Sequence, residues 1–286
     1  MRTLRGTGRH LGSGTDMTAD RGDSDNVANL APAAARAMRI LDVLAESRGT
    51  ALSLTEIADR IGAAKSSTSN ICVILEAARM IRRDSRGFVL GLRTVELGGA
   101  YLSSFDEIRE FYRLCTESEV LRHRLVQLAT LEGHDVLYLA RYEGATPLVL
   151  TAAVGDRFPA SATALGGALL MVLTPEQIAM RYEGEQNLPI LTEHSTPTVK
   201  DLQAKVQSAR DRGYSIDYGE VFSTVFGIAV PIRPQLRDGQ PMAVGVSIIE
   251  RRRDSIPDQA TIDETVAALQ DMAHALGNPM SCNAMK

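Results

Sequence analysis

The residues best suited to contact another molecule form one small polar face between positions 65 and 73. At helical spacing, apolar residues occupy one side of this segment. The opposite side carries Lys65, Ser66, Ser69, Val73 and, at its edge, Asn70. Hydroxyl and amide groups can bind base edges or phosphates, Lys can neutralise a phosphate, and Val can touch a thymine methyl. The pattern predicts a DNA-reading face, although a solvated helix face has the same composition.

Catalytic and metal-binding chemistry has much weaker support. The three cysteines are far apart and odd in number, which argues against a disulfide framework and favours a reducing cytoplasm. The five histidines never fall at metal-ligand spacing, and no G-x-S-x-G motif occurs. His134 and Asp135 are adjacent, but neighbours on a strand point to opposite faces. We therefore expect no cofactor, no metal and no enzyme, with a small-acid hydrolase as the remotest alternative.

Two short helices are predicted before the polar face. Helical spacing of apolar residues begins at Ala33, and Gly49 ends this first helix. Residues 53–56 then form a capping-box pattern, Ser-Leu-Thr-Glu, that starts the second helix. Gly62 is suited to the left-handed position that ends it.

The polar face itself belongs to a third helix that begins near Lys65. Its apolar stripe, which should face the core, is formed by Ile71, Ile74, Leu75 and Ala78. Strands at 80–83 and 88–90 follow around a turn at 84–87. Three helices and a β-hairpin are the order of a winged helix-turn-helix, whose third helix enters the major groove with its N-terminal part.

Charge is divided unevenly along the chain. The 286 residues include 31 basic and 35 acidic side chains, for a formal charge of −4. Residues 33–104 carry ten basic and seven acidic groups, whereas residues 105–286 carry 17 and 24. A basic segment beside an acidic one is expected if only the first meets phosphates. The predicted wing holds Arg82, Arg83 and Arg86, which would contact the DNA backbone or simply be solvated.

The rest of the chain predicts a linker and an α/β domain. Helical spacing from Arg93 to about Leu131, broken at 103–104, predicts helices that connect two domains and form part of a dimer interface. Strands are predicted at 136–141, 147–154, 214–218, 228–232 and 242–249. Helical segments are predicted at 168–172, from 174, at 199–211 and at 259–276. A central antiparallel sheet flanked by helices is the simplest assembly.

Several stretches resemble the IclR family of transcriptional regulators. They are RAMRIL at 36–41, LSLTEIADRIG at 52–62, KSST at 65–68 with Leu-Glu at 75–76, FVLG at 88–91, ATALGGALL at 162–170, GYSIDYGE at 213–220 and IAVPI at 228–232. The resemblance covers about residues 33–280. It implies an α+β chain in which a winged helix-turn-helix precedes a GAF-like effector-binding domain with a central antiparallel sheet. It also implies a homodimer, often paired into a tetramer, that binds a double-stranded DNA operator.

The resemblance also implies where an effector would bind. By family position, the ligand would lie against Ala162, Thr163, Ala164, Leu165, Gly166, Asp217, Gly227, Ile228 and Ser247. A small-residue turn leading into a helix exposes backbone N–H groups that bind anions, and Thr163 and Ser247 would add hydroxyl donors. Asp217 and Glu220 would bind a hydroxyl or an amine, or fix nearby backbone. Alternatively, the small residues serve only tight helix–sheet packing, Glu220 lies on the surface and Ser247 is an ordinary strand residue.

The sequence departs from the family pattern at four positions. Ser69 stands where His is common, Asn70 where Arg is common, Arg79 where Gly is frequent and Gly167 where Lys is frequent. The first two changes bear on which operator is read, and the fourth removes a charge from the pocket segment.

These observations predict five segments. Residues 1–31 form a disordered tail, 32–92 the winged helix-turn-helix, 93–104 a linker helix, 105–280 the effector-binding domain and 281–286 a second tail. No apolar run is long enough to span a membrane and no secretory signal is present, so we expect a cytoplasmic protein. The predicted function is operator binding controlled by a small organic or aromatic acid. The alternative is a metabolite-binding protein whose helix-turn-helix serves mainly in dimerisation.

Overall fold

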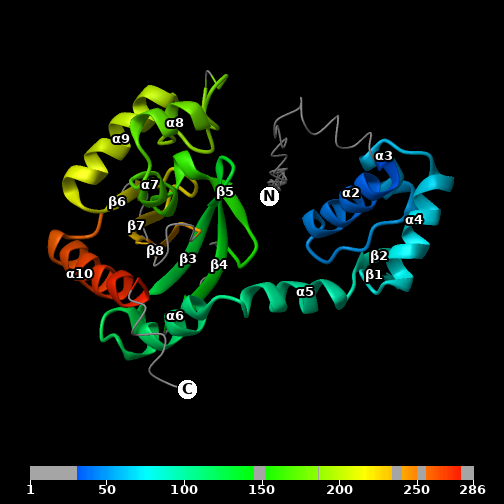
Figure 1. Cartoon of the computed structure of the whole chain (residues 1–286), viewed down its shortest axis with the longest axis horizontal. Helices are drawn as coiled ribbons and strands as arrows, with labels where there is room; N and C mark the ends of the chain where they lie inside the picture. The colour runs from blue at the N-terminus through cyan, green and yellow to red at the C-terminus, as the bar shows by residue number, and fades with distance from the viewer. Residues whose placement is uncertain (1–30, 145–151, 186, 234–239, 250–255, 278–286) are drawn as a thin grey trace, which may run out of the picture. The chain divides into compact units, whose positions relative to one another are not determined.

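The computed structural model describes residues 31–144, 152–185, 187–233, 240–249 and 256–277. The chain divides into two compact units, Met1–Gly99 and Ala100–Lys286, which Figure 1 shows joined through helix α5 (Arg93–Leu102). The tail predicted at 281–286, all of the tail predicted at 1–31 except Ala31, and most of the strand predicted at 147–154 lie outside the described residues.

The first unit is a winged helix-turn-helix, as predicted. Helices α2 (Pro32–Glu46), α3 (Leu54–Ile61) and α4 (Lys65–Ala77) pack against one another. Strands β1 (Ile81–Asp84) and β2 (Gly87–Leu90) then form an antiparallel hairpin. A small core holds this unit together, formed mainly by Ile40, Leu44, Ile57, Ile61, Ile71, Leu75 and Phe88.

Local signals account for the tight turn between α3 and α4. The Ser53 N–H donates to Glu56 Oε2 at 2.8 Å, and the Glu56 N–H donates to Ser53 Oγ at 3.3 Å, which completes the predicted capping box. Gly62 ends α3 with φ +64°, in the left-handed region that glycine adopts without strain. The wing is tied to the segment before α3, because the Leu52 N–H donates to the Phe88 carbonyl oxygen at 3.0 Å.

The predicted core stripe of α4 was wrong at Ile74 and Ala78, which are exposed. The buried residues of this helix are Thr68, Ile71, Cys72 and Leu75. Thr68 tolerates burial because its hydroxyl donates to the Ala64 carbonyl oxygen at 3.1 Å. With 3.6 residues per turn, Ile74 lies about 100° around the helix from Leu75. This places it outside the buried stripe although its side chain is apolar.

The connection between the units begins as predicted and then departs from the prediction. Helix α5 ends at Leu102 and α6 (Asp106–Glu117) follows, with the expected break between them. The helical prediction up to Leu131 was wrong, because a short 3₁₀ turn (Leu121–His123) leads into strand β3 (Leu125–Glu132). This strand is buried on both faces, so its apolar residues run continuously and fit helical spacing equally well.

The second unit contains the predicted antiparallel sheet. Its strands are β3, β4 (Asp135–Glu143), β5 (Arg157–Pro159), β6 (Ser215–Tyr218), β7 (Val225–Ile232) and β8 (Met242–Ile249). They are ordered β5-β4-β3-β8-β7-β6, and every neighbouring pair is antiparallel. The three-residue strand β5 was not predicted from the sequence.

Helices cover both faces of this sheet (Figure 1). Helix α6 and α10 (Gln259–Leu276) pack on one face, and α7 (Ala164–Leu170) packs on the other. Helix α9 (Val199–Arg212) lies against α7, and α8 (Pro175–Arg181) contacts α9. Among the described residues, no helix has the length and apolar character needed to cross a membrane.

Candidate nucleic-acid interface and ligand pocket

The structure places the predicted DNA-reading residues on one accessible face of α4. Lys65, Ser66, Asn70 and Val73 are exposed, and Ser69 is half-buried. Val73 is 56% exposed, a high value for an apolar side chain in the middle of a helix. The buried side of α4 faces α2 and α3, so this helix presents its polar N-terminal half outward.

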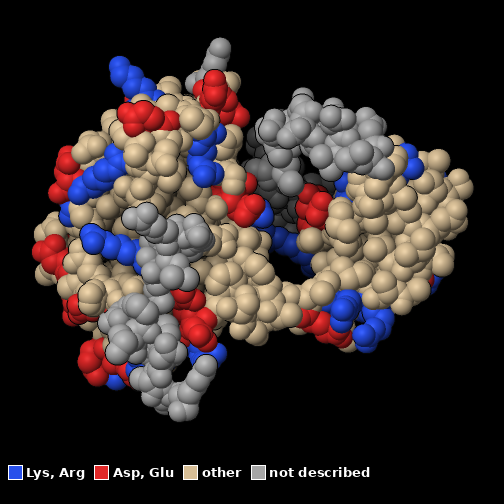
Figure 2. All heavy atoms as spheres, in the orientation of Figure 1, with Lys and Arg blue, Asp and Glu red and all other residues tan. Residues whose placement is uncertain are grey.

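The three wing arginines have different surroundings. Arg82 and Arg86 are exposed. Arg83 is already engaged, because its Nε donates to Glu76 Oε2 at 3.2 Å and its guanidinium lies 4.6 Å from the centre of the Phe88 ring. Arg82 and Arg86 are therefore better placed than Arg83 to meet a phosphate. In Figure 2, Lys and Arg atoms near the junction of the hairpin with α5 lie beside Asp and Glu atoms, and both signs of charge are also spread over the second unit.

A pocket lies between α7 and the sheet of the second unit. Asp217, Gly227 and Ser247 are register partners on β6, β7 and β8, so the side chains of Asp217 and Ser247 share the face that α7 covers, on either side of Gly227. Gly227 allows the close approach of α7, because a Cβ at this position would lie 3.0 Å from Ala164 Cβ. Gly245 has the same role, since a Cβ there would lie 3.2 Å from Leu165 Cδ2.

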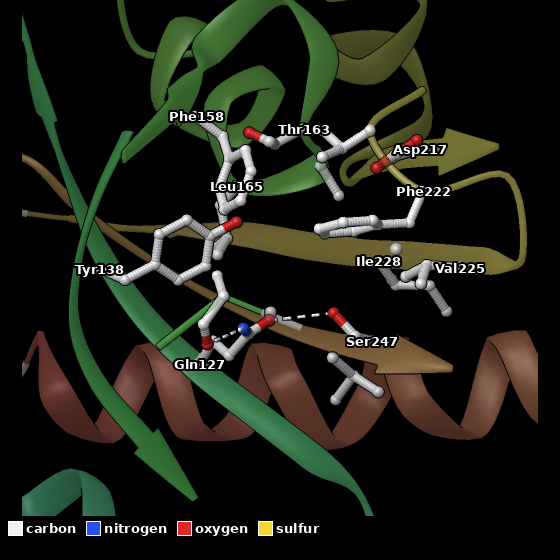
Figure 3. A pocket seen from close by; sticks show the side chains of 16 residues that line it. Gln127, Tyr138, Phe158, Thr163, Leu165, Asp217, Phe222, Val225, Ile228 and Ser247 are labelled. Atoms are coloured by element: carbon white, nitrogen blue, oxygen red, sulfur yellow. Dashed lines mark hydrogen bonds between the residues drawn. The ribbon is translucent and has the colours of Figure 1, made fainter. Parts of the chain in front are cut away.

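The hollow that results contains about 470 Å³ of space, its open mouth included. It is lined by Gln127, Tyr138, Ala152, Phe158, Thr163, Ala164, Leu165, Asp217, Val221, Phe222, Val225, Gly227, Ile228, Gly245, Val246 and Ser247. Figure 3 shows the rings of Tyr138 and Phe222 facing each other across this space, with Thr163 and Asp217 toward α7 and Gln127 and Ser247 on the sheet.

Seven of the nine residues predicted from the resemblance line this pocket, and Ala162 and Gly166 do not. Gly166 serves packing instead, because a Cβ there would lie 2.1 Å from the Ala160 carbonyl oxygen. The Gly166 N–H donates to Thr163 Oγ1 at 2.9 Å, which caps the start of α7. The Ile228 side chain is buried in the core on the α6 and α10 side of the sheet, so this residue borders the pocket from the opposite face of the sheet.

Sequence reasoning missed the aromatic and amide part of the lining. Tyr138 and Phe158 meet edge to face at 6.0 Å, and Phe158 and Phe222 at 5.7 Å. Gln127 Nε2 donates to the Ala152 carbonyl oxygen at 3.3 Å, and Ser247 Oγ donates to Gln127 Oε1 at 2.9 Å. Because β3 is buried on both faces, its sequence shows no alternation that could have indicated Gln127 as a pocket residue.

Asp217 is the one carboxyl group among the described residues of the lining. It is only 6% exposed, and burial raises its pKa from the ordinary 3.8 to about 7. The N–H of Glu220 donates to its Oδ1 at 2.7 Å, which opposes part of that rise. Glu220 lies outside the lining and is buried against Lys205, so it is neither a ligand-facing group nor a surface residue.

The lining supports binding better than catalysis. Among the lining residues that the structure describes, the polar groups are one carboxyl, one amide and the hydroxyls of Tyr138, Thr163 and Ser247, and no His, Cys, Lys or Arg is present. A nucleophile activated by an adjacent base is therefore lacking among these residues. In the part of the chain that the structure describes, no cluster of His, Cys, Asp and Glu could hold a metal ion.

A winged helix-turn-helix joined to a domain with a pocket of this kind defines a ligand-responsive, DNA-binding regulator. Two family models match the chain: the IclR helix-turn-helix domain over residues 33–85 and the bacterial transcriptional regulator IclR C-terminal domain over residues 99–278. The chain belongs to the IclR family of transcriptional regulators and acts as a regulator, not as an enzyme.

Individual relatives agree with this assignment. The Pca regulon regulatory protein of Pseudomonas putida is 28% identical over 263 residues, which cover 91% of this chain and 88% of that protein. The IclR-type regulator of Alicyclobacillus acidocaldarius has the same fold, with a TM-score of 0.72 and 22% identity over 86% of this chain and 97% of that one. An IclR homologue from Microbacterium hydrocarbonoxydans, solved with 4-hydroxybenzoate, gives a TM-score of 0.68 with 22% identity over 85% and 98% of the two chains.

Proposed function

We propose that α4 reads operator DNA with its N-terminal half while the wing binds the DNA backbone. The observation that carries this proposal is a single exposed face on α4, formed by Lys65, Ser66, Asn70 and Val73, with Ser69 beside it. Recognition helices enter the major groove at this end. The exposed guanidinium groups of Arg82 and Arg86, with Arg83 in a lesser role, supply phosphate contacts.

The test is binding of the purified full chain to a DNA fragment from upstream of its own gene, measured by fluorescence anisotropy. Affinity should fall steeply as salt rises, because phosphate contacts release counterions. The double variant Lys65→Ala/Arg82→Ala should bind more weakly and keep the wild-type circular dichroism spectrum. Unchanged affinity in that variant would remove this face from the DNA contact, and failure to bind any fragment at low salt would favour a helix-turn-helix that serves mainly in dimerisation.

We propose that the effector is a small aromatic acid that carries a hydroxyl group. Three aromatic rings of the lining suit a planar ligand, and Asp217 can accept a hydrogen bond from its hydroxyl. The hydroxyls of Tyr138 and Thr163 act as neutral donors to the carboxylate, since no Lys or Arg occurs among the described residues of the lining. The solved relative with 4-hydroxybenzoate supports this choice of ligand class.

Matched ligands test this assignment. A ligand that binds only the folded state raises the melting temperature by mass action. We expect 4-hydroxybenzoate to raise it more than benzoate or 4-methoxybenzoate, because only the first can donate to Asp217. The same compound should release the operator fragment. Equal shifts for the three compounds would exclude recognition of the hydroxyl by Asp217.

We further propose that the regulator is a homodimer, with pairing of dimers into tetramers as a second level. Helix α5 supports this, because it has no buried residue and leaves Leu92 76%, Val95 70% and Leu97 48% exposed at or beside it. We also propose functional boundaries at 32–92, 93–104 and 105–280. As a regulator of transcription it would work in the cytoplasm, where its operator lies.

A further inference from the structure

Glu220 lies behind the wall of the pocket and uses all of its polar groups there. Its carboxylate pairs with Lys205 Nζ and accepts from the N–H and Oγ1 of Thr196, at 3.2 and 2.9 Å. Its own N–H donates to Asp217 Oδ1, and its carbonyl oxygen accepts from Ser195 Oγ at 2.8 Å. One buried residue therefore joins β6, α9 and the 195–196 segment.

The partners of Glu220 place it between two walls of the pocket. Lys205, from the middle of α9, also donates to the Ser161 carbonyl oxygen at 3.0 Å, two residues before Thr163. Val221 and Phe222, which follow Glu220 directly, line the pocket. The ion pair thus links the wall formed by residues 161–165 to the wall formed by residues 217–222.

A contribution to stability does not explain why Lys205 and Glu220 form a buried ion pair. The Lys205 and Glu220 side chains are 19% and 7% exposed, so both have lost most of their hydration. Buried ion pairs of this kind contribute little net stability compared with apolar residues of the same size. Charge-assisted hydrogen bonds do, however, fix the geometry of the groups that they join.

We propose that Lys205 and Glu220 are positioning residues for the effector, which they do not touch: they hold Asp217 and Phe222 at the separation from Thr163 that ligand binding requires. This inference rests on the proposed function of the pocket. Lys205→Met should raise the effector concentration needed to release the operator about tenfold, as expected when a buried hydrogen-bonded partner is lost. Operator affinity without effector should not change.

A measurement on Asp217 tests, without any ligand, whether the Lys205–Glu220 pair lies close enough to act on this carboxyl. The titratable and charged groups that act on Asp217 are Glu220, Lys205 and Tyr138. The charge of Glu220 raises the pKa of Asp217, and the charge of Lys205 lowers it. Glu220→Gln should therefore lower the Asp217 midpoint, and Lys205→Met should raise it. Carbon-13 spectra of labelled aspartate carboxyls, with Asp217→Asn for assignment, follow both shifts; a general loosening of the fold would not produce opposite signs.

Two further variants keep the test decisive. Lys205→Met/Glu220→Gln leaves no unpaired buried charge, so it should fold and still respond poorly to effector even if Lys205→Met unfolds. Arg109→Met breaks the exposed pair with Asp106 and should change neither property. If 4-hydroxybenzoate, benzoate and 4-methoxybenzoate all fail to release the operator from the wild type, the proposed ligand class is wrong, and the titration still shows whether the pair acts on Asp217 as the positioning role requires. Equal Asp217 midpoints in the wild type and both single variants would overturn that role, as would an unchanged effector response in the double variant.

Discussion

Gly167 and Ser215 share one small space where α7 packs on β6. A Cβ at position 167 would lie 2.1 Å from Ser215 Oγ and 3.2 Å from its Cβ. The Ser215 hydroxyl is buried and has no hydrogen-bond partner within the described structure. Gly167 therefore allows the Ser215 side chain to fill the contact between helix and sheet.

This relationship predicts coupled effects on stability. Gly167→Ala should lower the free energy of unfolding by about 1–3 kcal/mol, because overpacking outweighs the gain in helix propensity. Ser215→Ala should be close to neutral, since it removes a hydroxyl that lacks a partner. In the Ser215→Ala background, Gly167→Ala should cost at least ~1 kcal/mol less than alone, as urea unfolding would show. Additive effects would show that the two positions do not compete for space.

Asp217 predicts an unusual dependence of stability on pH. The folded protein keeps this proton up to about pH 7, whereas an unfolded aspartate releases it near 3.8. Between these values the folded state binds more protons, so raising the pH lowers stability. From pH 5 to pH 8 this group alone should cost roughly 2–3 kcal/mol of unfolding free energy.

The matching variant is Asp217→Asn, which keeps an oxygen to accept from the Glu220 N–H. Its unfolding free energy should vary less between pH 5 and pH 8 than that of the wild type. Asp106→Asn, on the exposed surface of α6, should retain the wild-type dependence. If the unfolding free energy of the wild type and of Asp217→Asn varied equally with pH, Asp217 would be ionised throughout this range.

The helix-turn-helix was predictable because its signals are local. Ser53, Glu56 and Gly62 lie within one short stretch and determine where α3 begins and ends. A few neighbouring residues also determine the wing turn. Burial on α4 was less predictable, because it depends on how the helix is rotated against its neighbours. The apolar side chain of Ile74 gives no information on that rotation.

The pocket was predictable only where the family resemblance supplied it. Gln127 reaches the pocket because β3 pairs with β8, a contact between segments more than 100 residues apart. Phe158 belongs to a strand of three residues, too short to show alternation. The sequence left Glu220 open between a ligand-binding group, a group that fixes nearby backbone and a surface group, because its burial depends on Lys205 and Thr196 from other elements. Long-range pairing of this kind leaves little trace in local residue patterns.

The wing arginines should differ in their effect on DNA binding. Arg82→Ala and Arg86→Ala should each weaken binding to all sequences and reduce the slope of log affinity against log salt by about 0.9, the effect of one phosphate contact. Arg83→Ala should change this slope less, because Glu76 and Phe88 already hold its guanidinium. Arg109→Ala on α6 is the control for total charge. A larger loss of slope for Arg83 than for Arg82 would reverse the proposed roles.

The exposed apolar side chains beside α5 predict how the chain associates. Val95→Glu would place a charge at the proposed interface, where burial without a partner is costly. It should shift the protein toward monomer in sedimentation velocity and weaken operator binding. Met180→Glu, at a 73% exposed apolar residue of α8, is the matched control. A Val95→Glu protein that sediments like the wild type would place the interface elsewhere.

Arg79 has a backbone conformation that is unfavourable for a residue with a side chain. It follows α4 with φ +60°, in the left-handed region that glycine favours. Its N–H donates to the Glu76 carbonyl oxygen and the Met80 N–H to the Leu75 carbonyl oxygen, both at 2.9 Å, which is the pattern of a Schellman cap. A side chain at this position costs about 1 kcal/mol, and the exposed ion pair with Glu96 at 3.8 Å offsets little of it.

Two substitutions at this position separate backbone strain from charge. Arg79→Ala removes the ion pair and keeps the strained Cβ, whereas Arg79→Gly removes both. The glycine variant should have a free energy of unfolding about 0.5–1 kcal/mol higher than the alanine variant, even though glycine adds entropy to the unfolded chain. Urea unfolding would show this difference. At Gly62, where φ is +64°, the reverse change Gly62→Ala should cost a similar amount. If the alanine variant is instead the more stable by about 0.4–1 kcal/mol, the entropic cost of glycine, the left-handed conformation of this turn carries no strain.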